Sequence, residues 1–163
     1  MVDWHHSARN VKNLILYIHP ISIGMVIGCD LLNMEPVPGA ILFSNSDFTS
    51  NDTHAKIMQA SKDVRSIFDV VLSDMAPNSS GQKDLDHDRI ISLSYSVLRF
   101  ALLNSSIGAN LITKVWTGPK LENLLMDIEK FYNVVERVKP NSSRKDSGEI
   151  YLIGRDFKGI KKK

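Results

Sequence analysis

The chain has almost no cysteine and no long apolar run. Cys29 is the single cysteine among its 163 residues, so an intrachain disulfide and a metal site built from cysteines are both excluded. No apolar run approaches the roughly 20 residues that a membrane-spanning helix needs. A lone cysteine fits a reducing compartment, where disulfides are rare.

The chain also lacks a large excess of charge of either sign. Its formal net charge is +2, with 43% hydrophobic and 23% charged residues. This composition is that of a globular domain and excludes a disordered or fibrous protein. A chain of this length fits one domain that can bury a core.

Basic residues nevertheless gather in the last quarter of the chain. They are Arg137, Lys139, Arg144, Lys145, Arg155, Lys158 and Lys161 to Lys163. Basic residues concentrated at one end suggest contact with the phosphates of a nucleic acid. For residues 161–163 the alternative is a solubilising tail. Arg144 and Lys145 lie in a polar loop beside the candidate site described below, and for them contact with RNA is the functional interpretation.

The N-terminal segment identifies no targeting signal. A mitochondrial transit peptide is rich in arginine and poor in acidic residues. Residues 1–16 contain only Arg9 and Lys12 as basic residues, with Asp3 against them.

The hydrophobic pattern predicts strands that alternate with helices. Apolar runs predict strands at 11–18, 40–43, 68–73, 110–116, 134–138 and 149–153, with a further apolar run at 21–32. Helical periodicity and capping residues predict helices at 52–66 and 84–103 and a third that begins at Pro119. Such alternation implies a mainly parallel sheet covered on both faces. The last two strands have no helix between them, so we expect them to pair antiparallel.

Charged residues follow several of these strands. Asp30, Asp47, Asp74 and Lys114 lie at or just past strand ends, where open α/β sheets bind their ligands. Asp30 is placed to accept the two hydroxyls of a ribose, and its alternative is a helix cap or a turn. Asp47, followed by Phe48, could recognise the edge of an adenine, and its alternative is an Asx-turn.

Lys114 lies inside an apolar strand, where a solvated lysine is not expected. Burial lowers the pKa of a lysine, and a neutral amine can take a proton. Asp74 and Glu149 would oppose that shift while fixing the position of the amine. The alternative is a structural ion pair or an edge lysine whose head reaches water.

The run Asp84-Leu-Asp-His-Asp88 looks like a metal cluster on paper. An acidic first turn stabilises a helix without any metal, and we prefer that interpretation. His5 and His6 lack partners at a useful spacing. The sequence therefore predicts no metal site.

Several motifs together resemble one family. They are Ser73-Asp-Met-Ala-Pro-Asn78, Asp84-Leu-Asp-His-Asp-Arg89, Lys114-Val-Trp116, Lys139-Pro140, Ser143-Arg144 and Ser147-Gly-Glu-Ile-Tyr151. In combination they closely resemble the FtsJ/RrmJ-type ribosomal RNA 2′-O-methyltransferases, and most of all the mitochondrial, rRNA methyltransferase 2-like branch. The resemblance runs from about residue 23 to residue 157.

The resemblance implies a fold, a cofactor and a set of roles. The fold would be a Rossmann-like methyltransferase sheet with an antiparallel last strand, and the cofactor S-adenosylmethionine. Of the family's Lys-Asp-Lys-Glu tetrad, Lys114 resembles the base, Asp74 the acid that also borders the cofactor's methionine end, and Glu149 the closing acid. Asp30 resembles the residue at the cofactor ribose and Asp47 the one at its adenine. The implied reaction methylates a ribose 2′-hydroxyl, of a uridine in large-subunit mitochondrial rRNA.

The chain departs from the family at its beginning. The family opens with a helix that carries the first tetrad lysine, and then a strand that runs into a Gly-Ala-Ala-Pro-Gly-x-Trp loop; neither occurs here. We expect residues 1–20 to be a divergent segment in which 11–18 could replace the missing strand, residues 21–157 a partial methyltransferase domain and 158–163 a basic tail. Glycine normally lets that loop approach the cofactor closely, so we expect weak or no cofactor binding by this chain alone.

Two other functions compete with this one. The first is a non-catalytic protein that keeps the methyltransferase fold and serves in RNA binding or ribosome assembly. The second is a nicotinamide-dependent oxidoreductase with Asp30 at the ribose, but no Gly-x-Gly-x-x-Gly precedes Asp30. The sequence does not identify the oligomeric state.

Overall fold

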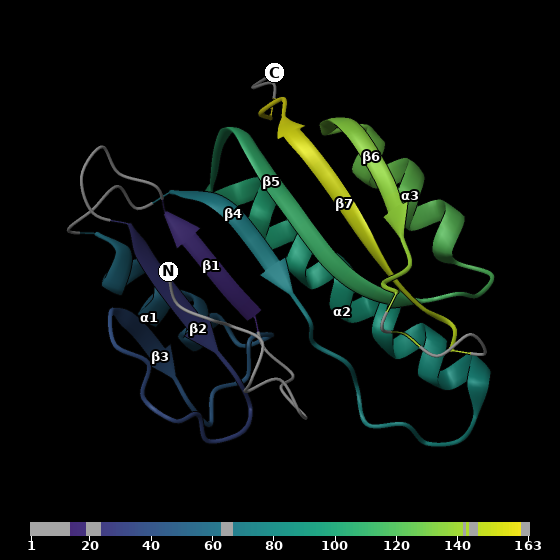
Figure 1. The fold of residues 1–163 in the computed structure, drawn as a ribbon, viewed down its shortest axis with the longest axis horizontal. Coiled ribbons are helices and arrows are strands. Elements are labelled where there is room, and N and C mark those ends of the chain that lie inside the picture. The colour runs from purple at the N-terminus through teal and green to yellow at the C-terminus, as the bar shows by residue number, and fades with distance from the viewer. Residues whose placement is uncertain (1–13, 19–23, 63–66, 142, 144–146, 161–163) are drawn as a thin grey trace.

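The protein forms one sheet with helices packed against it (Figure 1). This computed structural model describes residues 14–18, 24–62, 67–141, 143 and 147–160. The strands are β1 Leu14–Ile18, β2 Met25–Cys29, β3 Ala40–Phe43, β4 Phe68–Ser73, β5 Ser105–Trp116, β6 Tyr132–Val138 and β7 Glu149–Phe157. The helices are α1 Asn51–Ser61, α2 Lys83–Asn104 and α3 Leu121–Glu129. The sheet has seven strands in the order β3-β2-β1-β4-β5-β7-β6.

The sheet is mixed. β2 pairs in parallel with β3, and β4 with β5. β7 runs antiparallel to both of its neighbours, β5 and β6, which confirms the expected antiparallel last strand. β1 also runs antiparallel to both of its neighbours. As a result all strands except two share one direction. The two that run against it are β1 and β7.

β1 lies inside the sheet, between β2 and β4. Leu14 pairs with Cys29 on one side and with Ser73 on the other, and Tyr17 pairs with Val26 and Val70. Residues 14–18 thus take the place considered for a replacement strand at 11–18, whereas 11–13 lie outside the described residues. Without β1 the two halves of the sheet would not be joined by backbone hydrogen bonds.

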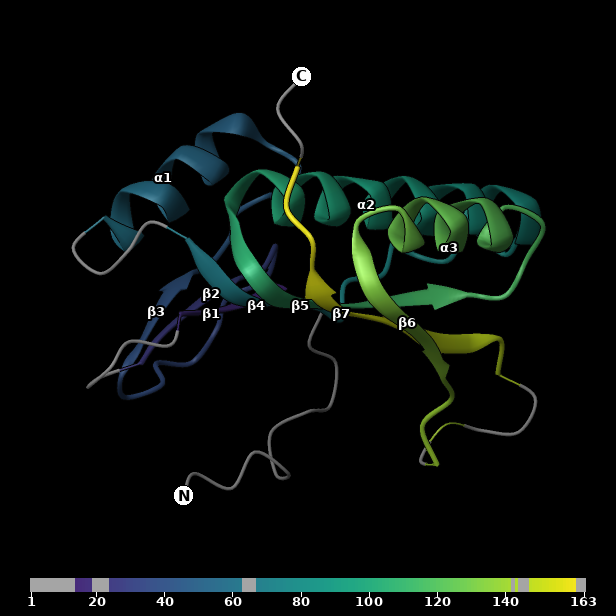
Figure 2. The ribbon, with the colours of Figure 1, turned by 90° about the horizontal axis from the view of Figure 1, so that it is seen from above.

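All three described helices cover the same face of the sheet (Figure 2). The expectation of helices on both faces is therefore wrong for the part of the chain that the structure describes. The cause is the strand order. The crossovers from β3 to β4, β4 to β5 and β5 to β6 all move toward the same edge, and right-handed crossovers in one direction place their helices on one face.

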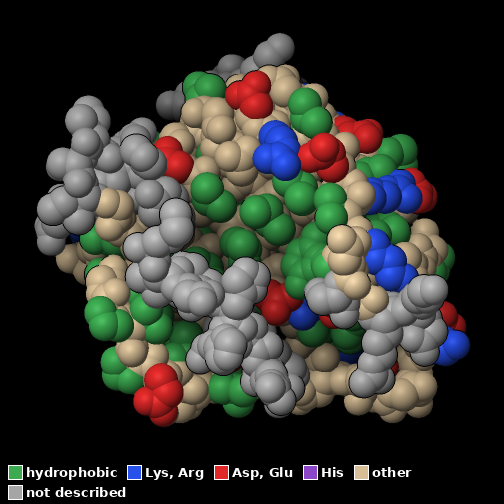
Figure 3. Space-filling model, in the orientation of Figure 1, with side chains coloured by type: hydrophobic (Ala, Val, Ile, Leu, Met, Phe, Trp, Pro, Cys, Tyr) green, Lys and Arg blue, Asp and Glu red, His purple; other side chains and the backbone are tan. Residues whose placement is uncertain are grey.

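The one described parallel connection that moves the other way, from β2 to β3, carries no helix. It contains Pro36, Pro38 and Gly39, and Gly39 has a positive φ of 83°. Proline has no amide hydrogen for a helical bond, and the positive φ fits a turn. The helix-free face therefore shows hydrophobic side chains over the middle of the sheet (Figure 3).

The core lies between the sheet and the helices. Side chains alternate along β5, so that Leu111, Thr113 and Val115 are buried on the helix side. The other buried residues of this core include Leu16, Ile27, Val71 and Leu152 from the strands and Ile57, Ile90, Val97, Leu124 and Ile128 from the helices. Lys114, Ile112 and Trp116 fall at the opposite positions of the alternation and so face the helix-free side.

Two elements differ in length from their predictions. α1 begins at Asn51 with Ser50 as its cap, because the Ser50 hydroxyl accepts from the Asp52 amide at 3.2 Å, and it ends at Ser61, short of the predicted 66. Residues 63–66 lie outside the described part. β5 starts directly after α2 at Ser105, although 105–108 looked like a terminating turn. A register shift between Phe68 and Val70 and the positive φ of Gly108 accommodate this early start. No helix of the described residues is long and apolar enough to cross a membrane.

The position of β1 inside the sheet leads to a matched pair of substitutions. Leu16 is 1% exposed on the helix side of β1, whereas its neighbour Ile15 is half-buried on the other side. We expect Leu16→Ala to lower the free energy of unfolding by about 2–5 kcal/mol, as a large-to-small change in a core does, and Ile15→Ala by clearly less. Urea unfolding measures both. Two equally small losses would place β1 outside the core.

Candidate active site at the ends of β4, β5 and β7

Three strands bring the predicted charged residues together at one edge of the sheet. Asp74 directly follows β4, Lys114 lies near the end of β5, and Glu149 opens β7. β4 and β5 are parallel, so they end at the same edge, and β7 is antiparallel to β5, so it begins there. The register pairs Lys114 with Tyr151 and Trp116 with Glu149.

Lys114 makes the closest charged contact of this group. Its Nζ lies 2.9 Å from Asp74 Oδ1 and 3.9 Å from Glu149 Oε2. Lys114 as a whole is 9% exposed, so its ammonium is held away from bulk water, where attraction to carboxylates is stronger. Ser143 Oγ lies 3.5 Å from Glu149 Oε1. The amine is thus fixed in position by two carboxylates from different strands.

Tyr151 belongs to the same group, although sequence reasoning gave it no role. Its hydroxyl donates to Asp74 Oδ1 at 2.5 Å, so one carboxylate oxygen receives both the phenol and the Lys114 amine. Burial, followed by the hydrogen bond to Asp74 and the charges of Asp74 and Glu149, raises the pKa of Tyr151. The phenol therefore remains a donor at neutral pH. The usable signal was its spacing, because two residues from Glu149 on a strand means the same face.

A cavity of about 370 Å³ lies beside this group, at the ends of β2 and β3. Asp30 and Asp47 both line it, as do the apolar side chains of Leu31, Phe48 and Met75. The two predicted cofactor acids are therefore brought to one cavity. Its size falls in the range of small-molecule sites, and apolar walls with a few polar groups are typical of them.

Both acids also make turns. Asp30 is 4% exposed, and its Oδ1 accepts from the Leu32 amide at 2.9 Å. Asp47 Oδ1 accepts from the amide of Thr49 at 2.8 Å and from its hydroxyl at 2.7 Å. The Asx-turn alternative for Asp47 thus describes its local geometry, and the same turn presents it to the cavity. Burial, then the charges of Asp30 and Asp47, raises the pKa of Cys29 to about 11.

The loop after β4 joins the charged group to the cavity. Asp74 contacts Lys114, and the next three residues, Met75 to Pro77, line the cavity. Arg144 and Lys145, predicted to contact RNA, lie outside the described residues, as do His5 and His6. Among the described residues, no group of three or more histidine, cysteine or acidic side chains could hold a metal ion.

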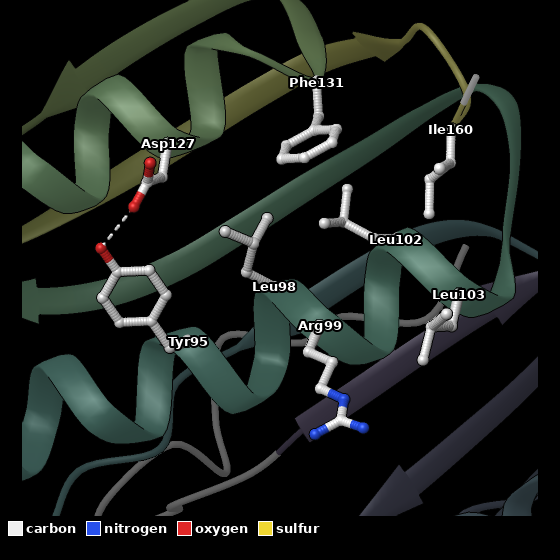
Figure 4. Close-up of a pocket in the computed structure, with 8 residues that line it drawn as sticks. All are labelled: Tyr95, Leu98, Arg99, Leu102, Leu103, Asp127, Phe131 and Ile160. Atoms are coloured by element: carbon white, nitrogen blue, oxygen red, sulfur yellow. Dashed lines mark hydrogen bonds between the residues drawn. The ribbon is translucent and has the colours of Figure 1, made fainter. Parts of the chain in front are cut away.

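A second hollow, also of about 370 Å³, lies beside the C-terminal half of α2 (Figure 4). It lies between α2 and α3 and is lined by Leu98, Leu102 and Phe131 among others. The Tyr95 hydroxyl donates to Asp127 Oδ2 at 2.7 Å across it. It contains none of the predicted site residues.

Residues 8–157 match the model of a protein family described as FtsJ-like methyltransferase. The chain belongs to the FtsJ-like methyltransferase family. It is 45% identical over 136 residues to the mitochondrial rRNA methyltransferase 2 of Drosophila melanogaster, which covers 83% of this chain and 54% of the fly protein. It is 40% identical to the ribosomal RNA large subunit methyltransferase E of Magnetococcus marinus, over 83% of this chain and 62% of the bacterial one.

A solved structure agrees with the fold. A crystal structure of a ribosomal RNA methyltransferase from Plasmodium falciparum superposes with a TM-score of 0.71 at 25% identity, over 82% of this chain and 72% of that one. The family and the Rossmann-like methyltransferase fold suggested by the sequence motifs are confirmed. The chain spans only about half to three-fifths of the length of the two curated relatives.

The bond from Tyr151 to Asp74 has a matched counterpart in Tyr95 and Asp127. Each tyrosine hydroxyl donates to one carboxylate, and a hydrogen bond to a charged group contributes about 1.5–3 kcal/mol. Tyr151→Phe and Tyr95→Phe should therefore each lower the free energy of unfolding by no more than this amount. Only Tyr151→Phe should alter the side-chain NMR signal of the Lys114 ammonium, since only Tyr151 shares Asp74 with Lys114. An unchanged Lys114 signal in Tyr151→Phe, or a change of equal size in Tyr95→Phe, would contradict this geometry.

Proposed function

We propose that this chain carries the catalytic and cofactor-binding residues of an RNA 2′-O-methyltransferase. The reaction transfers a methyl group from S-adenosylmethionine to a ribose 2′-hydroxyl. The observation that carries the proposal is the position of the Lys114 amine between Asp74 and Glu149, next to a nucleoside-sized cavity with two acids. One loop, residues 74–77, borders both.

The cavity fits the adenosine part of such a cofactor. Asp30 at the end of β2 would accept from the ribose hydroxyls, and Asp47 would accept from the adenine edge. Leu31, Phe48 and Met75 offer apolar surface to the base. When bound, S-adenosylmethionine supplies a methyl group on a positively charged sulfur. Asp74 borders the cavity through its neighbour Met75, and its carboxylate favours that charge.

Lys114 would remove the proton of the 2′-hydroxyl. General-base catalysis by a positioned side chain contributes about 10²–10⁴ in rate. In the reacting complex the amine must be in its neutral form to accept a proton. Asp74 and Glu149 orient it, and Tyr151 in turn fixes Asp74. The rest of the rate would come from holding the attacking oxygen in line, for which positioning is effective.

The helix-free face of the sheet suits a large substrate. Lys114 alternates with the buried Thr113 and Val115 and pairs with Tyr151, so both face the side opposite to the core. That side of the sheet carries none of the described helices (Figure 2), so a ribose on an RNA strand can approach without displacing one. Arg144 and Lys145 follow β6 and precede Glu149 in the sequence, and we assign them to phosphate contact. Lys139 donates to the Ser147 carbonyl at 2.9 Å, which ties the two ends of that segment together.

The relatives suggest the RNA. Those compared above are named as methyltransferases of ribosomal RNA, the bacterial one of the large subunit. The fly relative is mitochondrial. We therefore propose a uridine of large-subunit rRNA as substrate and the mitochondrion as the location.

A non-catalytic RNA-binding protein is the second candidate. One observation favours it. Among the described residues, Lys114 is the single cation that contacts Asp74 or Glu149, so two carboxylates share one amine. The two candidates differ in whether the chain binds S-adenosylmethionine, and we expect this binding to be weaker than micromolar for the chain alone.

Substitution of Lys114 separates catalysis from binding. We expect Lys114→Met, which keeps the side-chain length, to lower the single-turnover rate of methyl transfer to rRNA by about 10²-fold or more. The Kd for S-adenosylmethionine, measured by calorimetric titration, should stay within about twofold, while Asp30→Asn should weaken it. Lys56→Met is the control, because Lys56 is an exposed partner of Asp52 on α1.

Two results would decide against the enzyme. Methyl transfer by Lys114→Met at the wild-type rate would remove Lys114 from the reaction. No binding of S-adenosylmethionine by the wild-type chain, even at about millimolar concentration, together with intact RNA binding, would favour the non-catalytic candidate.

A further inference from the structure

The acidic run at the start of α2 has no place in the proposed reaction, yet its middle residue is buried. Asp86 is 7% exposed. Its Oδ1 accepts from the Ser80 amide at 2.8 Å and from the Ser80 hydroxyl at 2.7 Å. Its Oδ2 accepts from the Ser79 hydroxyl at 3.0 Å and from the Gly81 amide at 3.2 Å. One carboxylate thus gathers the loop that leads from Asp74 to α2.

The next residue holds a different loop. His87 is 4% exposed, and its Nε2 accepts from the backbone amide of Lys120 at 3.1 Å. Its ring also lies against Gly118, where an added Cβ would come within 2.5 Å of Nδ1. Gly118 and Lys120 belong to the connection that leaves β5 after Lys114. The contact therefore fixes the end of β5 to the first turn of α2.

We propose that Asp86 and His87 are positioning residues that hold the loops after β4 and β5 and so set the separation of Asp74 and Lys114. Asp74 and Lys114 come from different strands, and the segments that follow them are both anchored to the same helical turn. The claim that Asp86 and His87 affect catalysis rests on the proposed function. The claim that they hold the two loops does not.

Helix stabilisation alone does not explain the arrangement. Asp84, in the same first turn, is exposed, as expected of a residue that only balances the helix dipole. Asp86 instead accepts from four donors on three loop residues and is buried. The bonds from Ser80, first of all its hydroxyl, lower the pKa of Asp86 to about 2, so the carboxylate remains charged at neutral pH.

The contact between Asp74 and Lys114 is short, so a small displacement of either loop would change it. Asp74 Oδ1 and Lys114 Nζ are 2.9 Å apart, and a displacement of about 1 Å can cost about 10²-fold in rate at a reacting centre. A rigid helix turn that holds both loops limits such displacement. Loss of either anchor would leave the loop that follows one of the two partners less constrained.

The test uses two disrupting substitutions, one rescue and one control. Asp86→Asn replaces one accepting oxygen with an amide group that faces N–H donors. His87→Leu removes the acceptor for Lys120, and His87→Gln restores an acceptor near the position of Nε2. Asp84→Asn changes an exposed acid in the same turn. All are made in the full chain.

Three measurements are made on each variant, the first of them the urea midpoint of unfolding. The side-chain NMR signal of the Lys114 ammonium reports its contact with Asp74. Methyl transfer to rRNA gives kcat and the KM for S-adenosylmethionine. We expect Asp86→Asn and His87→Leu to shift or broaden the Lys114 signal and to lower kcat about tenfold or more, with KM within about twofold. His87→Gln should recover most of both, and Asp84→Asn should match the wild type.

The outcomes separate this inference from the proposed function. An unchanged Lys114 signal and kcat in folded Asp86→Asn and His87→Leu would overturn it. So would a lower urea midpoint with the Lys114 signal intact, which is the result of a purely structural role. If Asp86→Asn does not fold, the His87 pair decides alone. Absence of methyl transfer by the wild type would overturn the enzyme, and the NMR comparison would still decide whether the loops are held.

Discussion

The contact between the Lys114 amine and the Asp74 carboxylate is the interaction on which the candidate site depends. The two residues lie 40 positions apart in the chain and meet because β4 and β5 run in parallel and end at one edge. β7 then adds Tyr151 and Glu149 from the other side of β5. Lys114 is 9% exposed, and a buried charge left without a partner is strongly destabilising, so these carboxylates also stabilise this edge of the fold.

The strand order determines how that site faces solvent. β1 joins the two halves of the sheet, and the three crossovers that contain a described helix all move toward one edge, so these helices cover one face. Lys114 alternates with buried Thr113 and Val115 and therefore lies on the other face. The described helices thus bury the core from the side opposite to Lys114, and the acid-lined cavity lies beside this residue. In the proposed reaction, a small cofactor in the cavity and a large RNA on the helix-free face would meet at residue 74.

Much of this edge could be predicted from the sequence, because apolar runs mark strands and parallel strands end together. That logic places Asp74 and Lys114 correctly. It does not give the face that the helices cover, which depends on the order of strands distant in the chain. It misses the early start of β5, because 105–108 looks like a polar turn. Tyr151 needs the cross-strand register, and Asp86 needs the loop that folds back on it. From the local sequence alone, Asp86 is explained equally well as an acid that stabilises the first turn of a helix.

The position of the transferred methyl group tests the central claim most directly. Strand cleavage by alkali requires a free 2′-hydroxyl next to the phosphate, so a 2′-O-methyl group protects its own linkage. Large-subunit rRNA would be incubated with the chain and S-adenosylmethionine carrying a labelled methyl group, and then digested with alkali. If Lys114 activates a ribose 2′-hydroxyl, the label is recovered in alkali-resistant dinucleotides and depends on Lys114. Label recovered in mononucleotides would mean methylation of a base and would contradict this claim.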